Sequence, residues 1–137
     1  MPVAPIDQST LDAVGGNTEI TILNSAVRSV TNVSADLTNR GAAGVIIYFN
    51  VSAVPGTDTV TLSVEGKDPV SGNYGVIFTA AAIATTVQPA RYIIYPGASG
   101  TGPTATLACP IPRTWRVKIT HSAASNFTYS VGAAYVP

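Results

Sequence analysis

Residues 113–136 alternate apolar and polar side chains with the two-residue period of a β-strand. Trp115, Val117 and Ile119 fall on one side of the first half, and polar or charged residues separate them. After a polar stretch at 122–126, the alternation resumes with Phe127, Tyr129, Val131 and Tyr135. The pattern predicts two antiparallel strands joined by a small loop, with one buried and one exposed face.

The remainder of the chain repeats this pattern and predicts an all-β fold. Short strands are expected at residues 18–24, 26–34, 43–53, 58–66, 73–80, 84–95, 103–109, 113–121 and 126–136. Pro55-Gly56 favours a type II turn, and DPVSGN at 68–73 favours a hairpin loop. Together these features predict one antiparallel β-sandwich domain, jelly-roll-like or Ig-like, over residues 18–137, preceded by an extended N-terminal arm at 1–17.

The side-chain pattern also predicts which strand faces are exposed. In residues 60–65 the even-numbered positions are apolar and are expected to face the core, whereas Glu65 is expected to face solvent. Residues 45–49, VIIYF, and 92–95, YIIY, are apolar on both faces, so we expect these strands to be central or covered by another subunit. No strong amphipathic helix is expected, and residues 80–86 allow at most one helical turn.

The composition argues for a covered surface. Charged residues make up 10% of the chain, well below the roughly 25% of an ordinary soluble protein. Permanent interfaces are depleted in charge, so we expect a homo-oligomer or a docked protein. The sequence has no basic run to bind nucleic acid and no apolar stretch long enough to span a membrane. We expect no signal peptide, because residues 1–16 contain neither a positively charged region nor an apolar region.

The N-terminal arm, residues 1–17, contains spaced apolar residues among polar ones. A disordered tail is one interpretation; the other is that these apolar residues lie along a neighbouring subunit. The expected partner-binding residues are the apolar positions of the arm and two tyrosines of a doubly apolar strand: Val3, Ile6, Leu11, Val14, Tyr92 and Tyr95.

The residues that could carry chemistry form no recognisable motif. His121 is the only histidine, and Cys109 is the only cysteine and is expected to be a buried, inert thiol. Glu65 and Asp68 are expected to be solvated charges. We therefore expect no enzyme: no catalytic residue, no metal site and no cofactor. An enzyme would instead require His121 beside a serine and a carboxylate in a cleft.

Four segments carry a resemblance to a known group of proteins: NRGAAGVIIYFNVSAV, TVTLSVEGKDPVSGNYGVIF, RYIIYPG and RTWRVKITHSAASNFTYSVGAAYV. On the basis of these segments, the chain over about residues 18–136 resembles a group of small proteins encoded among the head genes of tailed bacteriophages. The resemblance implies a virion structural protein of the capsid decoration, or cement, type. Such a protein is made in the host cytoplasm, binds the capsid exterior on the major capsid protein lattice, often as a trimer, and stabilises the head.

Two other roles stay open from the sequence. A neck or tail component of the virion is one of them, and it would favour a ring of higher order than a trimer. A carbohydrate-binding module that contacts host surface glycans would need an exposed aromatic row around Tyr74, Tyr92 or Tyr95. In the decoration hypothesis, the sandwich forms a trimer and the arm lies along capsid subunits.

Overall fold

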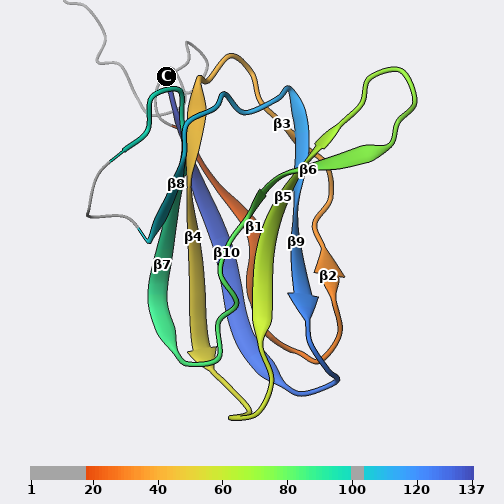
Figure 1. The fold of residues 1–137 in the computed structure, drawn as a ribbon, viewed down its shortest axis with the longest axis vertical. Coiled ribbons are helices and arrows are strands. Elements are labelled where there is room, and N and C mark those ends of the chain that lie inside the picture. The colour runs from red at the N-terminus through yellow and green to blue at the C-terminus, as the bar shows by residue number, and fades with distance from the viewer. Residues whose placement is uncertain (1–17, 100–103) are drawn as a thin grey trace, which may run out of the picture.

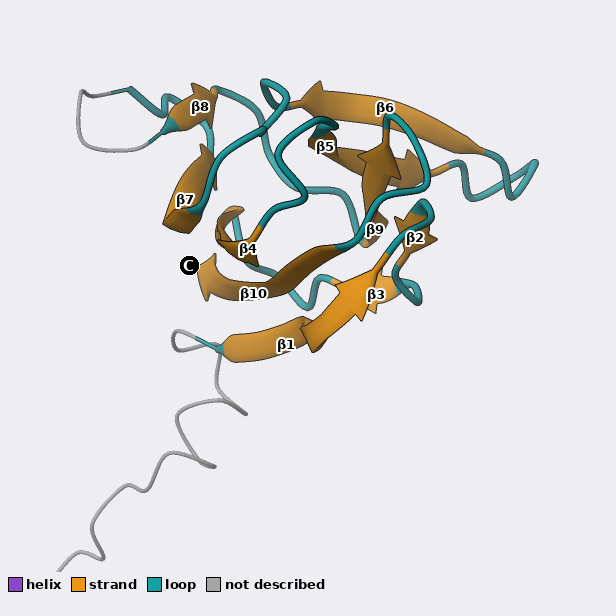
Figure 2. Cartoon of the chain, turned by 90° about the horizontal axis from the view of Figure 1, so that it is seen from below, coloured by secondary structure: helices purple, strands orange, loops and turns teal. Residues whose placement is uncertain are grey.

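The computed structural model describes residues 18–99 and 104–137, which form two packed β-sheets (Figures 1 and 2). In these ranges the chain forms strands and no helix. The strands are β1 (Glu19–Arg28), β2 (Asn32–Val33), β3 (Leu37–Thr38), β4 (Gly44–Ala53), β5 (Val60–Lys67), β6 (Tyr74–Thr79), β7 (Val87–Ile94), β8 (Ala105–Leu107), β9 (Thr114–His121) and β10 (Phe127–Val136). The expected all-β sandwich is confirmed.

The strand order identifies the kind of sandwich. The first sheet has the order β1-β10-β4-β7-β8, and the second has the order β2-β9-β5-β6, with β3 also pairing with β9. All neighbouring strands are antiparallel except β7 and β8. Without β3 and β8, the remaining strands in chain order form sheets 1-8-3-6 and 2-7-4-5. This is the jelly-roll arrangement of two Greek keys.

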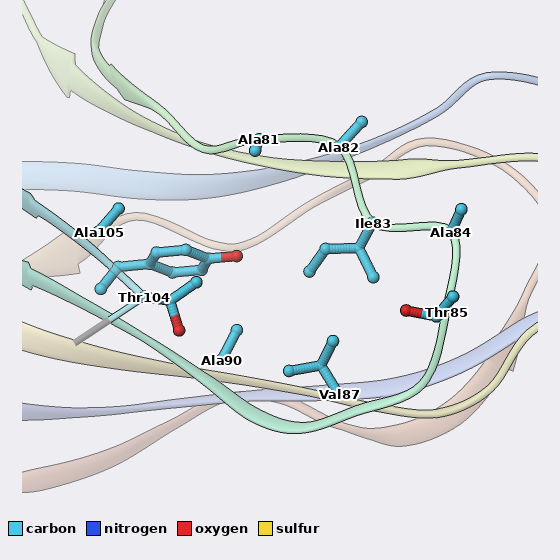
Figure 3. Close-up of a pocket in the computed structure, with 10 residues that line it drawn as sticks. Ala81, Ala82, Ile83, Ala84, Thr85, Val87, Ala90, Thr104 and Ala105 are labelled. Carbon is cyan, nitrogen blue, oxygen red and sulfur yellow. The ribbon is translucent and has the colours of Figure 1, made fainter. Parts of the chain in front are cut away.

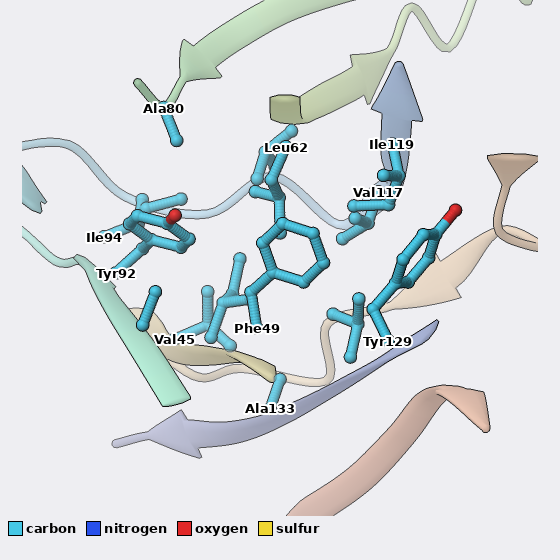
Figure 4. Close-up of a cluster of buried hydrophobic side chains, with 14 of the residues drawn as sticks. Val45, Phe49, Leu62, Ala80, Tyr92, Ile94, Val117, Ile119, Tyr129 and Ala133 are labelled. Atoms are coloured by element: carbon cyan, nitrogen blue, oxygen red, sulfur yellow. The ribbon is translucent and has the colours of Figure 1, made fainter. Parts of the chain in front are cut away.

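The core fills the space between the two sheets with aromatic and branched side chains. Trp115, Tyr92, Tyr129, Phe49 and Phe127 are the largest fully buried ones. Figure 4 shows Phe49 between Tyr92 and Tyr129, and its ring meets that of Tyr129 edge-on at a centroid distance of 5.5 Å. Burying each such side chain stabilises the fold by about 1.5–3 kcal/mol.

The pairing predicted for residues 113–136 is wrong, although both strands form. β9 belongs to the second sheet and pairs with β5, whereas β10 belongs to the first sheet and lies between β1 and β4. The loop at 122–126 therefore carries the chain from one sheet to the other. The alternation of apolar and polar residues predicts which face of a strand is buried, and both strands do bury one face. It does not predict which other strand lies beside it in a sheet.

Other expected elements are confirmed or corrected. The 68–73 loop joins β5 and β6 as a hairpin, with Asp68 N donating to Asn73 O at 2.7 Å. The two strands expected at 18–24 and 26–34 are instead one bulged strand, β1, followed by the short β2. No helical turn forms at 80–86, because Ile83 makes a β-bridge to Val60 at the edge of β5.

Candidate interaction site

The expected partner-binding residues do not gather on one described surface. Val3, Ile6, Leu11 and Val14 lie outside the described residues. Tyr92 is 2% exposed and packs on Phe78 in the core, with ring centroids 5.6 Å apart. Tyr95 is half-buried, and its hydroxyl donates to Pro137 O at 3.3 Å. The two tyrosines are three positions apart, so an extended backbone turns them to opposite sides.

The aromatic row that glycan binding would require is not formed by these tyrosines. The Tyr92 ring lies in the core. The Tyr74 ring is covered by the guanidinium of Arg116, whose central carbon lies 3.4 Å from the ring centroid. A sugar therefore finds no continuous aromatic surface at Tyr74, Tyr92 and Tyr95.

The outer side of the first sheet is a neutral surface, here called the neutral face. It consists of the outward residues of β10 and β4, which lie side by side in the rows Ala134–Ile46, Gly132–Tyr48 and Ser130–Asn50, and Ile93 and Arg91 of β7 border the first two rows. β4 and β10 contain no charged residue, and Tyr48 is 37% exposed. Arg91 is the charged residue at the β7 side of these rows. The doubly apolar strand at 45–49 is thus central, as expected, with an outer side open to the surroundings.

The outer side of the second sheet differs because it carries charges that pair with one another. Arg116 Nε donates to Glu65 Oε1 at 2.7 Å, and Lys67 Nζ lies 3.1 Å from Asp36 Oδ2. The Tyr74 hydroxyl donates to Asp36 Oδ1 at 2.6 Å. Hydrogen bonds from Tyr74 and then Lys67 lower the pKa of Asp36.

Glu65 was expected to be a solvated charge, and this expectation is wrong. Glu65 is only 7% exposed. It lies directly opposite Arg116 in the β5–β9 pair, and the two side chains form an ion pair. Asp68, in contrast, is exposed and organises the hairpin loop, accepting hydrogen bonds from Val70 N at 2.9 Å and Ser71 Oγ at 2.6 Å. The hydrogen bond from Ser71 is the main cause of its lowered pKa.

His121 lies against a tyrosine. Its Nε2 is 2.9 Å from the Tyr129 hydroxyl, and Asn32 Nδ2 donates to the same hydroxyl at 3.4 Å. Burial lowers the pKa of His121, and the nearby positive charge of Arg28 also lowers it. Ser125 Oγ donates to Asp58 and not to His121. The serine–histidine contact that an enzyme would need is therefore not made among the described residues.

A cavity of about 280 Å³ opens between the two sheets at one side of the sandwich. The segment at 81–85 forms one wall, and residues of β7 and the start of β8 form the other (Figure 3). Ile83, Val87 and Ala90 point into it, and Tyr92 also lines it. Most of the lining is alanine and other apolar side chains. Burial alone raises the pKa of Tyr92.

Several other groups offer no site within the described ranges. No group of three or more His, Cys, Asp and Glu residues lies close enough there to hold a metal ion. Cys109 is half-buried, and burial raises the pKa of its thiol. Nor do these ranges include a helix with the length and hydrophobicity needed to cross a bilayer.

Comparisons with known proteins identify no family for this chain. No protein-family model matches it, and no curated protein matches it. Among solved structures, it is similar to a chain in the structure of infectious bursal disease virus, Gx strain, with 15% sequence identity and a TM-score of 0.48. The match covers 86% of this chain but only 31% of the viral chain. This degree of similarity is too low to transfer a family or a function.

Proposed function

We propose that this chain is a capsid decoration protein, a non-enzymatic virion component that binds the outside of the major capsid protein lattice as a homotrimer and stabilises the head. The observation that carries the proposal is the neutral face. Its two central strands, β4 and β10, contain no charged residue along their entire length. An outward surface of this kind loses little hydration free energy when a partner covers it.

The contrast between the two sheets favours one docking side. On the second sheet, Arg116, Lys67 and Asp36 would lose water on docking, and their contacts with one another and with the buried Glu65 offset only part of that cost. On the neutral face, hydroxyl, amide and aliphatic groups predominate around Tyr48. We therefore assign the neutral face to the capsid and the charged side to solvent.

The fold fits this role mechanically. The jelly roll joins two sheets through one continuous core of aliphatic and aromatic side chains, and such close-packed interiors deform little. A decoration protein acts through many copies, and each copy that contacts more than one capsid subunit gains affinity from linked contacts. A deep ligand site is not needed for that function. The fold is shared by proteins of other functions, so the proposal depends on the surface and not on the fold.

Co-sedimentation with capsids tests the proposal. Capsids of the virion that encodes this chain, prepared without it, are mixed with the wild-type protein and with two single-lysine variants. Tyr48→Lys places a charge on the neutral face, and Thr120→Lys places one on the exposed outer side of the second sheet. We expect wild type and Thr120→Lys to sediment with capsids, and Tyr48→Lys to bind at least about tenfold more weakly because an unpaired charge would be buried.

Two results would contradict the proposal. Wild-type protein that stays in the supernatant would exclude capsid binding, and equal binding by both lysine variants would exclude the neutral face. Light scattering tests the trimer separately: three chains of 14.0 kDa give about 42 kDa, and a monomer at every concentration would contradict it. Circular dichroism of each variant verifies that the sandwich is folded.

A further inference from the structure

The cavity beside β7 and β8 contains an unused hydrogen-bonding group. Tyr92 is 2% exposed, and its hydroxyl has no hydrogen-bond partner among the described residues. Among the described residues, one side-chain nitrogen or oxygen atom is both fully enclosed and without a hydrogen-bond partner, and it is Nδ1 of His121. The unpaired Tyr92 hydroxyl is therefore not fully enclosed. It therefore reaches the cavity that Tyr92 lines. A ligand with an acceptor oxygen could pair with this hydroxyl in place of water.

The cavity selects a particular chemistry. Its walls are methyl and aliphatic groups from Ala81, Ile83, Val87, Ala90 and Ala105. They favour a branched aliphatic side chain over a charged or aromatic one. The Tyr92 hydroxyl adds a donor for one carbonyl oxygen, and the hydroxyl-bearing residues Thr85 and Thr104 also line the cavity. This combination suits a proline-rich peptide, whose extended backbone leaves its carbonyl groups free while apolar side chains fill a pocket.

The chain contains such a peptide at its own N-terminus. Residues 2–6 read Pro-Val-Ala-Pro-Ile. In a polyproline II conformation, which has three residues per turn, Val3 and Ile6 would project from the same side. Both prolines restrict the free peptide, so binding in this conformation loses less entropy than binding of an ordinary segment.

We propose that the cavity binds residues 2–6 of a neighbouring copy of this chain, with Val3 or Ile6 inserted among the alanines and the Tyr92 hydroxyl donating to a carbonyl of the segment. This inference goes beyond the capsid-binding proposal, since it needs only copies of this chain. Ile6 precedes Thr18 by twelve positions, a span of up to about 40 Å. That length is enough to reach an adjacent molecule.

The placement of the arm's exit and of the cavity suits a contact between neighbouring copies. The described chain begins at β1, on one edge of the first sheet, whereas the cavity lies at β8, on the opposite edge. Four strand spacings of about 4.8 Å separate these edges by about 19 Å, a distance that the arm can also span within one molecule, so the mass of a crosslinked product has to distinguish the two arrangements. An arm that leaves one edge and a cavity that opens at the other form a head-to-tail contact, which gives a ring such as a trimer when the rotation between copies closes.

Charge also favours the contact. Residues 1–17 contain Asp7 and Asp12 and no Lys or Arg, which gives −2. The whole chain has seven acidic and seven basic residues, so residues 18–137 have five acidic and seven basic residues, which gives +2. The arm, whose two acidic residues follow the 2–6 segment, and the body that would receive it are therefore attracted to each other at low ionic strength.

Photo-crosslinking of the full chain tests the proposal without capsids. Ile6 is replaced by a diazirine-bearing aliphatic residue, and the irradiated protein is separated on a denaturing gel and mapped by mass spectrometry. We expect a product of twice the chain mass, crosslinked at 81–87 or at Ala105. A product of single-chain mass crosslinked there would assign the cavity to the same molecule and overturn the proposal, as would crosslinks elsewhere or none.

Matched variants identify the cavity as the receptor. Ala105 pairs with Tyr92 across β7 and β8 and shares its inward side, while Thr106 pairs with Ile93 on the outer side. Ala105→Leu fills the cavity and should lower the crosslink yield about tenfold, whereas Thr106→Leu should leave it unchanged. Tyr92→Phe removes only the donor and should lower the yield about fivefold. Unchanged yields in both cavity variants would overturn the proposal.

Discussion

The guanidinium of Arg116 lies over the ring of Tyr74, with its central carbon 3.4 Å from the ring centroid. The same side chain donates from Nε to the buried carboxylate of Glu65 at 2.7 Å. Arg116 of β9 thus joins β5, through Glu65, to β6, through Tyr74. The planar guanidinium is suited to this double contact, because it can stack on a ring and hydrogen-bond in its plane at the same time.

Removing Arg116 should therefore destabilise the sandwich. Arg116→Ala leaves the Glu65 carboxylate buried without its ion-pair partner, and we expect a loss of about 2 kcal/mol in the free energy of unfolding. Lys118→Ala, two positions along the same strand and on the same outer side, is the matched control and should change it by less than about 0.5 kcal/mol. Urea unfolding followed by circular dichroism measures both. Equal losses would show that the Glu65 contact contributes nothing.

A pair of tyrosine substitutions tests the buried hydrogen bond between the sheets. Trp115 Nε1 donates to the Tyr135 hydroxyl at 3.1 Å, and that hydroxyl donates to Thr38 O at 3.2 Å. Tyr135→Phe leaves the indole N–H buried without an acceptor and should cost about 1–3 kcal/mol of unfolding free energy. Tyr95→Phe removes an exposed hydroxyl and should cost less than about 0.5 kcal/mol. Similar urea midpoints for the two variants would show that the Tyr135 hydroxyl contributes no more to stability than the Tyr95 hydroxyl.

The sequence predicts the strands of this fold better than their arrangement. The expected strands at 113–121 and 126–136 match β9 and β10 closely, because period-two alternation is a local signal. Their pairing was not predictable, since a five-residue loop allows either a hairpin or a crossing between sheets. The jelly-roll order likewise depends on long-range pairs such as β10 with β4 and β9 with β5.

The sequence also predicts some features of the candidate surfaces and not others. The neutral face was partly predictable, because VIIYF at 45–49 is apolar on both sides and must be central or covered. The cavity was not, because it depends on how closely the irregular segment 81–85 approaches β7 and β8. The burial of Glu65 was also hidden, since only the β5–β9 register brings Arg116 opposite it.

Gly44 should be intolerant of any side chain. A Cβ atom there would overlap the Ile94 carbonyl oxygen and lie 2.8 Å from Tyr95 Cα, both backbone atoms that cannot move aside. Gly44→Ala should therefore cost about 3 kcal/mol or more, or prevent folding. Gly132→Ala is the control, because its nearest contact, Ile20 O, would be at an ordinary 3.6 Å. Thermal unfolding of both variants gives the comparison, and equal midpoints would contradict the close approach of β4 and β7.

The stability of the sandwich should fall in mildly acidic solution because of His121. Burial lowers its pKa in the folded state below the ordinary value of 6.5, so the unfolded chain binds a proton first as the pH falls. The stabilisation is complete above pH 6.5, begins to fall as the pH drops below that value, and is lost once the pH passes the folded-state pKa. We expect a lower urea midpoint at pH 5 than at pH 7.5.

A substitution attributes this pH dependence to one residue. His121 is the only histidine in the chain. Asp36 and Asp68 have pKa values lowered from the ordinary 3.8, so these carboxylates take up protons only below the interval from pH 5 to pH 7.5. His121→Gln keeps a side chain that can accept from the Tyr129 hydroxyl but cannot take up a proton. Its urea midpoint should be nearly the same at pH 5 and pH 7.5. A variant that still loses stability between these pH values would show that another group carries the effect.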